Sequence, residues 1–163
     1  MNKIELFTDG SVDINFNIGY GAYIVVTEPG LSFDELKKRI KVKRFEQTSS
    51  TKLEIQILLW ALNEIVSHGK RVVVYTDSQN ITRLPERKTR LEQNDYLSKN
   101  NRRLNHDELY REFFRITDFM DCEFVKVRGH QPTKNKDEIH RIFTLVDRAS
   151  RNALRREIIK NSQ

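Results

Sequence analysis

The sequence predicts an α/β fold with a mixed five-stranded sheet flanked by helices, and three observations support it. The runs Ile4–Phe7 and Val72–Tyr75 are largely apolar, and the second is mostly β-branched, which is typical of buried strands. A long apolar helix is expected over Ser50–His68, between these two strands. A second long amphipathic helix is expected from about Glu138 to Lys160. Strands and helices that alternate in this way pack as helices on the faces of one sheet.

Length and composition are consistent with a single domain over residues 1–163, because neither a repeat nor a composition shift marks a linker. The single cysteine, Cys122, cannot form an internal disulfide, and we expect a buried strand residue there rather than a nucleophile. No apolar run approaches the length of a membrane span, and the first residues do not resemble a signal peptide. We therefore expect a soluble, cytoplasmic monomer.

The charge balance favours a polyanionic partner. Lysine and arginine number 29 against 23 acidic residues, which gives a net charge of +6. The basic residues cluster in Lys37–Arg44, Arg83–Arg90 and Lys99–Arg103, whereas the acids are spread. Many basic proteins bind no nucleic acid, so charge alone leaves a solvated basic surface as an equal alternative.

The first half of the chain predicts an antiparallel meander of three strands. The first strand ends at Asp9-Gly10-Ser11, and the second, Gly19–Val26, is entered through glycines. Residues Leu31–Arg39 fit either a short helix or an excursion. Ile40–Glu46 is expected to be the third strand, with basic residues on one face.

The second half begins with the long helix over Ser50–His68, which Gly69 is expected to stop. A fourth strand and a short helical stretch ended by Pro85 come next. Residues Glu86–Asn105 are polar and basic, and we expect an exposed excursion with Leu91 and Tyr96 as sparse apolar anchors. The remaining expected elements are a helix over Asp107–Met120, a fifth strand over Cys122–Val127, a polar loop and the final helix.

Three acids stand at notable positions on these elements. Asp9 and Asp77 each close an apolar strand, where an ionised carboxylate is costly unless a cation or hydrogen-bond donors meet it. An Asp before a turn or at a helix N-cap would be the ordinary alternative for either residue. Glu54 lies in the first turn of the core face of its helix. Thr51-x-x-Glu54 has the form of a capping box, and spacing alone favours that cap.

Five segments together closely resemble ribonuclease H of type 1: Phe7–Ser11, Lys52-Leu53-Glu54, Tyr75–Ser78, Val127–His130 and Leu145–Arg151. The resemblance covers nearly the whole chain and implies the ribonuclease H-like fold. It also implies that Asp9, Glu54, Asp77 and Asp147 hold two Mg²⁺ or Mn²⁺ ions, against the capping box, and that His130 assists turnover. The implied activity is endonucleolytic hydrolysis of the RNA strand of RNA/DNA hybrids.

This chemistry requires the residue types found. Two divalent ions roughly 3.5–4 Å apart can activate water, stabilise the leaving oxygen and neutralise charge. Four crowded carboxylates would repel one another without a cation. Asp9 is the best candidate to bridge both ions, with Glu54 and Asp77 completing one site and Asp147 the other. His130 could relay a proton or help the product to depart.

The resemblance also implies residues that contact the hybrid. Members of the family commonly carry Asn-Asn-Arg where this chain has Ser50-Thr51-Lys52, and hydroxyl groups can still bond a ribose 2′-OH. We expect substrate contacts from Ser11 as well, and phosphate contacts from basic residues of the excursion, namely Arg87, Lys88 and Arg90. Trp60, in the middle of its helix, is expected to pack in the core.

Two other functions compete with this one. Another nuclease of the ribonuclease H-like superfamily, such as a resolvase or an exonuclease, would share the acids but lack the Gly-His loop before the last Asp. A non-catalytic module that binds hybrids or other nucleic acids would keep the fold and the basic surface. The intact set of acids argues against the second alternative.

Overall fold

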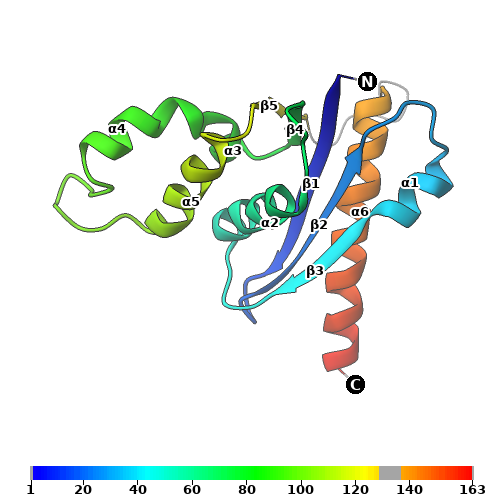
Figure 1. Ribbon diagram of the computed structural model, residues 1–163. Helices are drawn as coiled ribbons and strands as arrows, with labels where there is room; N and C mark the ends of the chain where they lie inside the picture. Colours follow the sequence, from blue (N-terminus) through cyan, green and yellow to red (C-terminus); the bar gives the residue numbers. More distant parts are fainter. Residues whose placement is uncertain (1, 129–136, 163) are drawn as a thin grey trace.

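The computed structural model describes residues 2–128 and 137–162 as a mixed five-stranded sheet with helices on both faces (Figure 1). The strand order is β3-β2-β1-β4-β5. Strands β1 to β3 are antiparallel neighbours, whereas β4 pairs parallel with β1, and β5 parallel with β4. This confirms the predicted sheet and its antiparallel meander. The strands are β1 Lys3–Asp13, β2 Ile18–Val26, β3 Lys41–Phe45, β4 Arg71–Thr76 and β5 Cys122–Lys126.

The sheet separates the apolar core into two layers, and each layer is covered by helices. One core cluster joins α2 and α5 to the sheet, and the other joins α6 and α1 to its opposite face. The helical elements are α1 Phe33–Arg39, α2 Ser50–Glu64, α3 Gln79–Arg83, the 3₁₀ helix η1 Pro85–Arg87, α4 Lys88–Gln93, α5 Asp107–Thr117 and α6 Glu138–Asn161. Along the residues described, no helix is both long and apolar enough to cross a membrane.

Strand β1 is longer than the sequence predicts. Gly10 and Ser11 do not form a turn, because they pair with Gly21 and Tyr20 of β2. The turn comes after Asp13, whose carboxylate accepts a hydrogen bond from the Asn15 backbone at 2.9 Å. On the other side of β1, its pairing with β4 ends at Phe7 and Tyr75. Within the described residues, β1 beyond this point therefore has a strand neighbour only on its β2 side.

Helix α2 begins with a different cap from the one that spacing favours. Ser49 is the N-cap, and its side chain accepts a hydrogen bond from the Lys52 backbone at 3.3 Å. The capping box of Thr51 and Glu54 is therefore wrong, which leaves Glu54 available for other contacts. The helix also ends at Glu64 rather than at His68, because Ile65 is extended and packs against the core.

Glycines let α2 approach the sheet closely. A Cβ atom on Gly21 would lie 2.3 Å from Cγ1 of Ile57, and one on Gly10 would lie 2.7 Å from Cδ1 of the same side chain. Leu53 also approaches within 2.8 Å of a Cβ atom on Gly10. Any larger residue would push the first turns of α2 away from the sheet. These glycines therefore help to set the position of Glu54, which lies between Leu53 and Ile57 on the helix.

The predicted excursion is more ordered than its polar composition suggests. It contains η1 and α4, and Leu91 and Tyr96 are only 4% exposed within the α5 side of the core. The Arg111 guanidinium lies 4.1 Å from the centre of the Tyr96 ring. The two predicted anchors are therefore confirmed, and the helical elements η1 and α4 are structure that the sequence did not predict.

Candidate active site

The register of β1 and β4 brings two predicted acids to one place. Phe7 pairs with Tyr75, and Asp9 and Asp77 each follow two residues later. Phe7 and Tyr75 stack with their ring centres 4.7 Å apart, and both belong to the core layer under α6. Because alternate residues of a strand share one face, Asp9 continues along the α6 side of β1 beside the end of β4.

Helix α6 supplies the third acid. Val146 is fully buried against the layer that contains Phe7, and the next residue is Asp147. The carboxyl groups of Asp9 and Asp147 share a hydrogen bond. The structure thus brings together Asp9, Asp77 and Asp147 from two neighbouring strands and the helix that crosses them.

The electrostatics of Asp9 reflect this convergence. Burial, followed by the charge of Asp77 and by the hydrogen bond and charge of Asp147, raises the pKa of Asp9 from 3.8 to about 9. The backbone N–H of Gly10 opposes the shift. At neutral pH and without a cation, Asp9 therefore carries a proton, and a cation that displaces this proton would relieve the repulsion.

Glu54 reaches the same region through a residue that sequence reasoning missed. The Ser78 hydroxyl donates a hydrogen bond of 2.6 Å to Oε2 of Glu54 and accepts one of 3.1 Å from the backbone of Ile81. Burial and the charge of Asp77 raise the pKa of Glu54, whereas the Ser78 hydroxyl lowers it. Ser78 thereby ties α2 to the end of β4 and caps α3. A serine directly after Asp77 and before a helix was the available signal.

The donor set suits a hard divalent cation. All four candidate ligands are carboxylates, and oxygen-only sites are typical of Mg²⁺ and Mn²⁺. In their present arrangement, no three acids, histidines or cysteines of the described chain stand close enough to hold one ion together. An ion bound here would replace the hydrogen bond between Asp9 and Asp147. It would also compete with Arg151, whose guanidinium lies 2.8 Å from Oδ2 of Asp147.

The residues expected to contact the hybrid begin around the acids. Ser11 lies on β1 two residues beyond Asp9, and its hydroxyl is 3.2 Å from that of Ser150 on α6. Ser50 and Thr51 are exposed in the first turn of α2, one turn before Glu54. Lys52 donates a hydrogen bond of 3.0 Å to the carbonyl of Gln47, so this ammonium group also braces the start of the helix.

The basic residues of the excursion differ in their surroundings. Arg87 donates a hydrogen bond of 3.2 Å to Oδ1 of Asn80, and Lys88 lies 2.6 Å from the Asp118 carboxylate. Arg90 is exposed, and it lines a concave surface between α4 and the segment that follows it. Arg87 and Lys88 therefore attach the excursion to α3 and to the end of α5, whereas Arg90 is free to meet solvent or a ligand.

Three further residues singled out in the sequence have different outcomes. His130 lies outside the described residues, so its role stays a prediction. Trp60 packs edge-on against Tyr23, with ring centres 4.6 Å apart, which confirms a packing role. Burial raises the pKa of the Cys122 thiol to about 11, which opposes a nucleophilic function.

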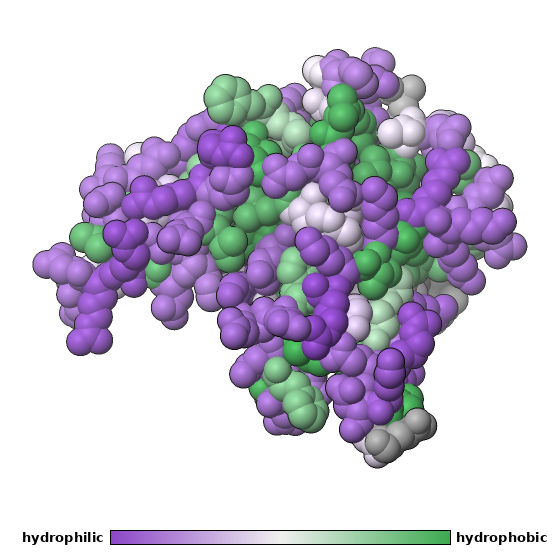
Figure 2. All heavy atoms as spheres, turned by 60° about the horizontal axis from the view of Figure 1, so that its bottom comes forward, coloured by the Kyte–Doolittle hydropathy of each residue, from purple (hydrophilic) through white to green (hydrophobic). Residues whose placement is uncertain are grey.

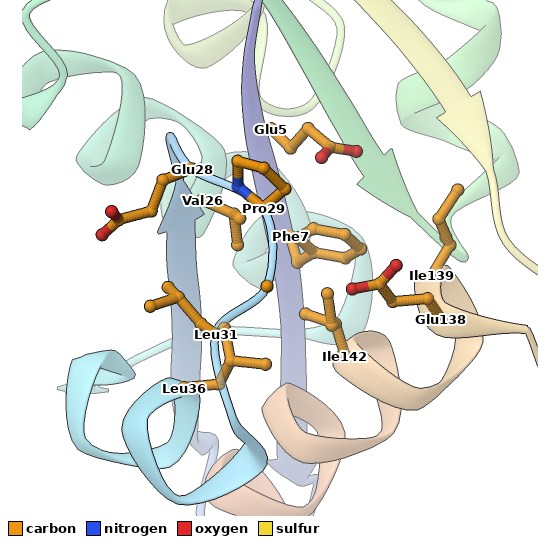
Figure 3. Close-up of a pocket in the computed structure, with 11 residues that line it drawn as sticks. Glu5, Phe7, Val26, Glu28, Pro29, Leu31, Leu36, Glu138, Ile139 and Ile142 are labelled. Carbon is orange, nitrogen blue, oxygen red and sulfur yellow. The ribbon is translucent and has the colours of Figure 1, made fainter. Parts of the chain in front are cut away.

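A separate pocket is lined by residues of β1, β2, α1 and α6 and of the segment that joins β2 to α1 (Figure 3). Phe7, Leu36 and Ile142 contribute apolar surface, and Glu5 and Glu138 are acidic residues of its lining. Its volume of about 90 Å³ is well below that of ordinary small-molecule sites. None of the four candidate acids lines this pocket, so we place the functional site at the acids and not in the pocket.

Comparisons with known proteins identify the family of this chain. A ribonuclease H of Moorella thermoacetica is 27% identical over 99% of this chain and 100% of its own length. The solution structure of the PFV RNase H domain matches with a TM-score of 0.69 at 15% identity and covers 92% of each chain. A foamy viral protease-reverse transcriptase in complex with dsDNA matches with a TM-score of 0.61 at 14% identity, over 91% of this chain and 92% of that one. The RNase H family model matches residues 1–152. The chain therefore belongs to the ribonuclease H family.

Proposed function

We propose that this protein is a type 1 ribonuclease H that cuts the RNA strand of RNA/DNA hybrids endonucleolytically with two Mg²⁺ or Mn²⁺ ions. The observation that carries the proposal is the convergence of Asp9, Asp77 and Asp147, with Glu54 held beside them by Ser78. A carboxyl group with a pKa near 9 among other acids is an expensive arrangement for a purely structural role.

The residues of the chain have distinct roles in this proposal. Bound ions would supply an activated water and would stabilise the leaving oxygen. Asp9, between Asp77 and Asp147, is our candidate ligand for both ions. Glu54 and Asp77 would complete one ion site and Asp147 the other. Ser78 would keep the Glu54 carboxylate oriented.

The net charge of the chain and its similarity to a nucleic-acid-binding protein support the proposed class of substrate. The net charge of +6 favours a polyanion, and one structural neighbour is a protein in complex with dsDNA. We assign contacts with the hybrid to Ser11, Ser50, Thr51 and Lys52, and we assign a phosphate contact to Arg90. Arg87 and Lys88 would contribute through their charge and by holding the excursion in place. We assign His130 to proton transfer or product release.

One assay tests this function. A labelled RNA/DNA hybrid, double-stranded RNA and double-stranded DNA are incubated with the protein in Mg²⁺ and in EDTA, and the ends of the products are mapped. We expect cleavage of RNA only in the hybrid and only with metal, with 5′-phosphate and 3′-hydroxyl ends. Equal cleavage of DNA duplexes would favour another nuclease of the superfamily. Tight hybrid binding without cleavage would favour a binding module.

Substitutions provide the matched comparison. Asp77→Asn should abolish cleavage, because it removes one ligand while nearly preserving shape. Asp13→Asn should cut like the parent, because Asp13 lies four residues beyond Asp9 on the same strand and accepts hydrogen bonds within its own turn. Loss of activity in both variants, or in neither, would contradict the assignment of the acids.

A further inference from the structure

Helix α6 continues beyond the residues that match the family and extends past the ends of the neighbouring strands (Figure 1). Glu157 fixes this extension to the sheet. The hydroxyl of Tyr20 in β2 donates a hydrogen bond of 2.7 Å to Oε1 of Glu157, and the guanidinium of Arg44 in β3 contacts the same carboxylate. The Glu157 side chain is only 14% exposed. The orientation of the last turns of α6 is therefore set by the sheet.

The part of α6 after Asp147, which includes this extension, carries a large excess of positive charge. After Asp147 the helix contains Arg148, Arg151, Arg155, Arg156 and Lys160, and the single acid among residues 148–161 is Glu157. Because Glu157 faces Tyr20 and Arg44, its charge is already compensated. The molecular face that includes this end of the protein is predominantly hydrophilic, with scattered apolar patches (Figure 2).

Three of these arginines lie on one side of the helix. Positions three and four apart are neighbours on an α-helix, so Arg148, Arg151 and Arg155 form a continuous exposed stripe, which we call the arginine row. Asp147 contacts Arg151 one turn along, so the row starts beside the acids. Arg156 points elsewhere, because one residue rotates the side chain by about 100°.

The row is unfavourable for an isolated helix. Like charges at these spacings repel one another and destabilise a helix. In the part of the chain that the structure describes, no acid forms an ion pair with Arg148 or Arg155, and Arg151 pairs only with Asp147. The region between Asp147 and the helix end can therefore accept a row of anions.

We propose that the arginine row binds backbone phosphates of the hybrid and extends the substrate footprint beyond the acid site. This proposal rests on the proposed function. Arg155 is eight residues after Asp147, which is about 12 Å along the helix at 1.5 Å per residue. One strand of a duplex advances by about 3.4 Å per nucleotide, so the row reaches roughly three to four nucleotides from the acids. Guanidinium groups suit this task because they bind phosphate oxygens in pairs.

Binding measurements can test the row separately from catalysis. We use the full chain with Asp77→Asn, which should bind without cutting, and measure the affinity for a labelled hybrid in Mg²⁺ at several salt concentrations. Adding Arg148→Ala and Arg155→Ala should weaken binding and reduce the salt slope by about 0.9 for each lost phosphate contact. Adding Arg156→Ala instead is the matched control and should change the slope little. Lysine at positions 148 and 155 should restore most of the slope.

The length of the hybrid supplies a second readout. Shortening the duplex from one end to fewer than about three nucleotides beyond the cut should remove the difference between parent and double variant. Equal slopes for the double variant and the Arg156→Ala control would overturn the proposal. If the parent cuts hybrids but the salt slopes of the double variant and the Arg156→Ala control are equal, the arginine row is refuted and the proposed function stands. A parent that binds through the row but never cuts refutes the proposed function alone.

Discussion

Asp9 shows how a single position gathers the electrostatics of the site. Its carboxyl group is enclosed by the sheet, by the end of β4 and by α6, and it is hydrogen-bonded to Asp147. The sequence suggested a carboxylate at a strand end, but the strand continues through it. The pairing of Gly10 and Ser11 with β2 depends on contacts distant in the chain, which local turn chemistry cannot predict.

The raised pKa of Asp9 makes the metal-free protein sensitive to pH. The folded state holds a proton on Asp9 up to about pH 9, whereas the unfolded chain loses it near 3.8. The stabilisation that this proton gives to the folded state is fully present below the pKa of Asp9 in the unfolded chain. It is lost as the pH rises through the pKa of Asp9 in the folded state. The parent should therefore lose up to about 1.4 kcal/mol of unfolding free energy per pH unit relative to Asp9→Asn.

Urea unfolding in EDTA at pH 5 and pH 8 measures this difference. The gap in unfolding free energy between Asp9→Asn and the parent should widen at the higher pH, with Asn as the more stable residue. Asp13→Asn corrects for the general effect of removing one acid. Parallel pH profiles for the parent and Asp9→Asn would show that Asp9 is not perturbed as described.

At the scale of elements, the close approach of α2 to the sheet depends on glycines of β1 and β2. Its apolar run predicted the helix correctly, but its start was set by Ser49 rather than by the pair Thr51 and Glu54. Spacing pointed to Thr51 as the cap, whereas the helix in the fold begins earlier, with Ser49 as the cap. The contact of Glu54 with Ser78 likewise joins residues 24 positions apart.

Enlarging one glycine should move α2. In Gly21→Ala, the new Cβ atom would meet Ile57 at 2.3 Å, so we expect a loss of about 1–3 kcal/mol in unfolding free energy. Because Glu54 precedes Ile57 on the same helix, the rate of cleavage at saturating hybrid should also fall.

A second substitution checks this cause. Ile57→Ala removes the atoms that clash, so the double variant should be more stable than the sum of the two single changes predicts. Simple additivity of the two unfolding free energies would mean that Gly21 does not govern the approach of α2.

For the whole molecule, hydrophobic periodicity predicted the sheet and its principal helices, because each buried run is long and distinct. It was less informative over Glu86–Asn105, where the apolar residues are few: Leu91, Tyr96, Leu97 and Leu104. There Leu91 of α4 is buried in the core cluster that also contains residues of α5, and this long-range packing has no local signature. The site acids were found through their order along the chain, whereas Ser78 and the arginine row required the folded arrangement.

Two basic regions on different elements, Arg90 of the excursion and Arg155 of α6, should act independently on the hybrid. In the Asp77→Asn background, losses of binding free energy from Arg90→Ala and Arg155→Ala should add within about 0.5 kcal/mol, as expected for distant sites. Hybrid titrations at one salt concentration measure both single variants and the double variant. A double variant no weaker than the worse single variant would place both residues on one contact.

The most direct test of the central claim, that the four acids form one cation site, is a calorimetric titration of Mg²⁺ and Mn²⁺ without nucleic acid. We predict saturable binding to the parent and to Asp13→Asn, and a large loss of affinity in Asp9→Asn and Asp77→Asn. Binding should also release protons at pH 7, because Asp9 must ionise to become a ligand. Metal binding by Asp9→Asn as tight as that of the parent would contradict the account.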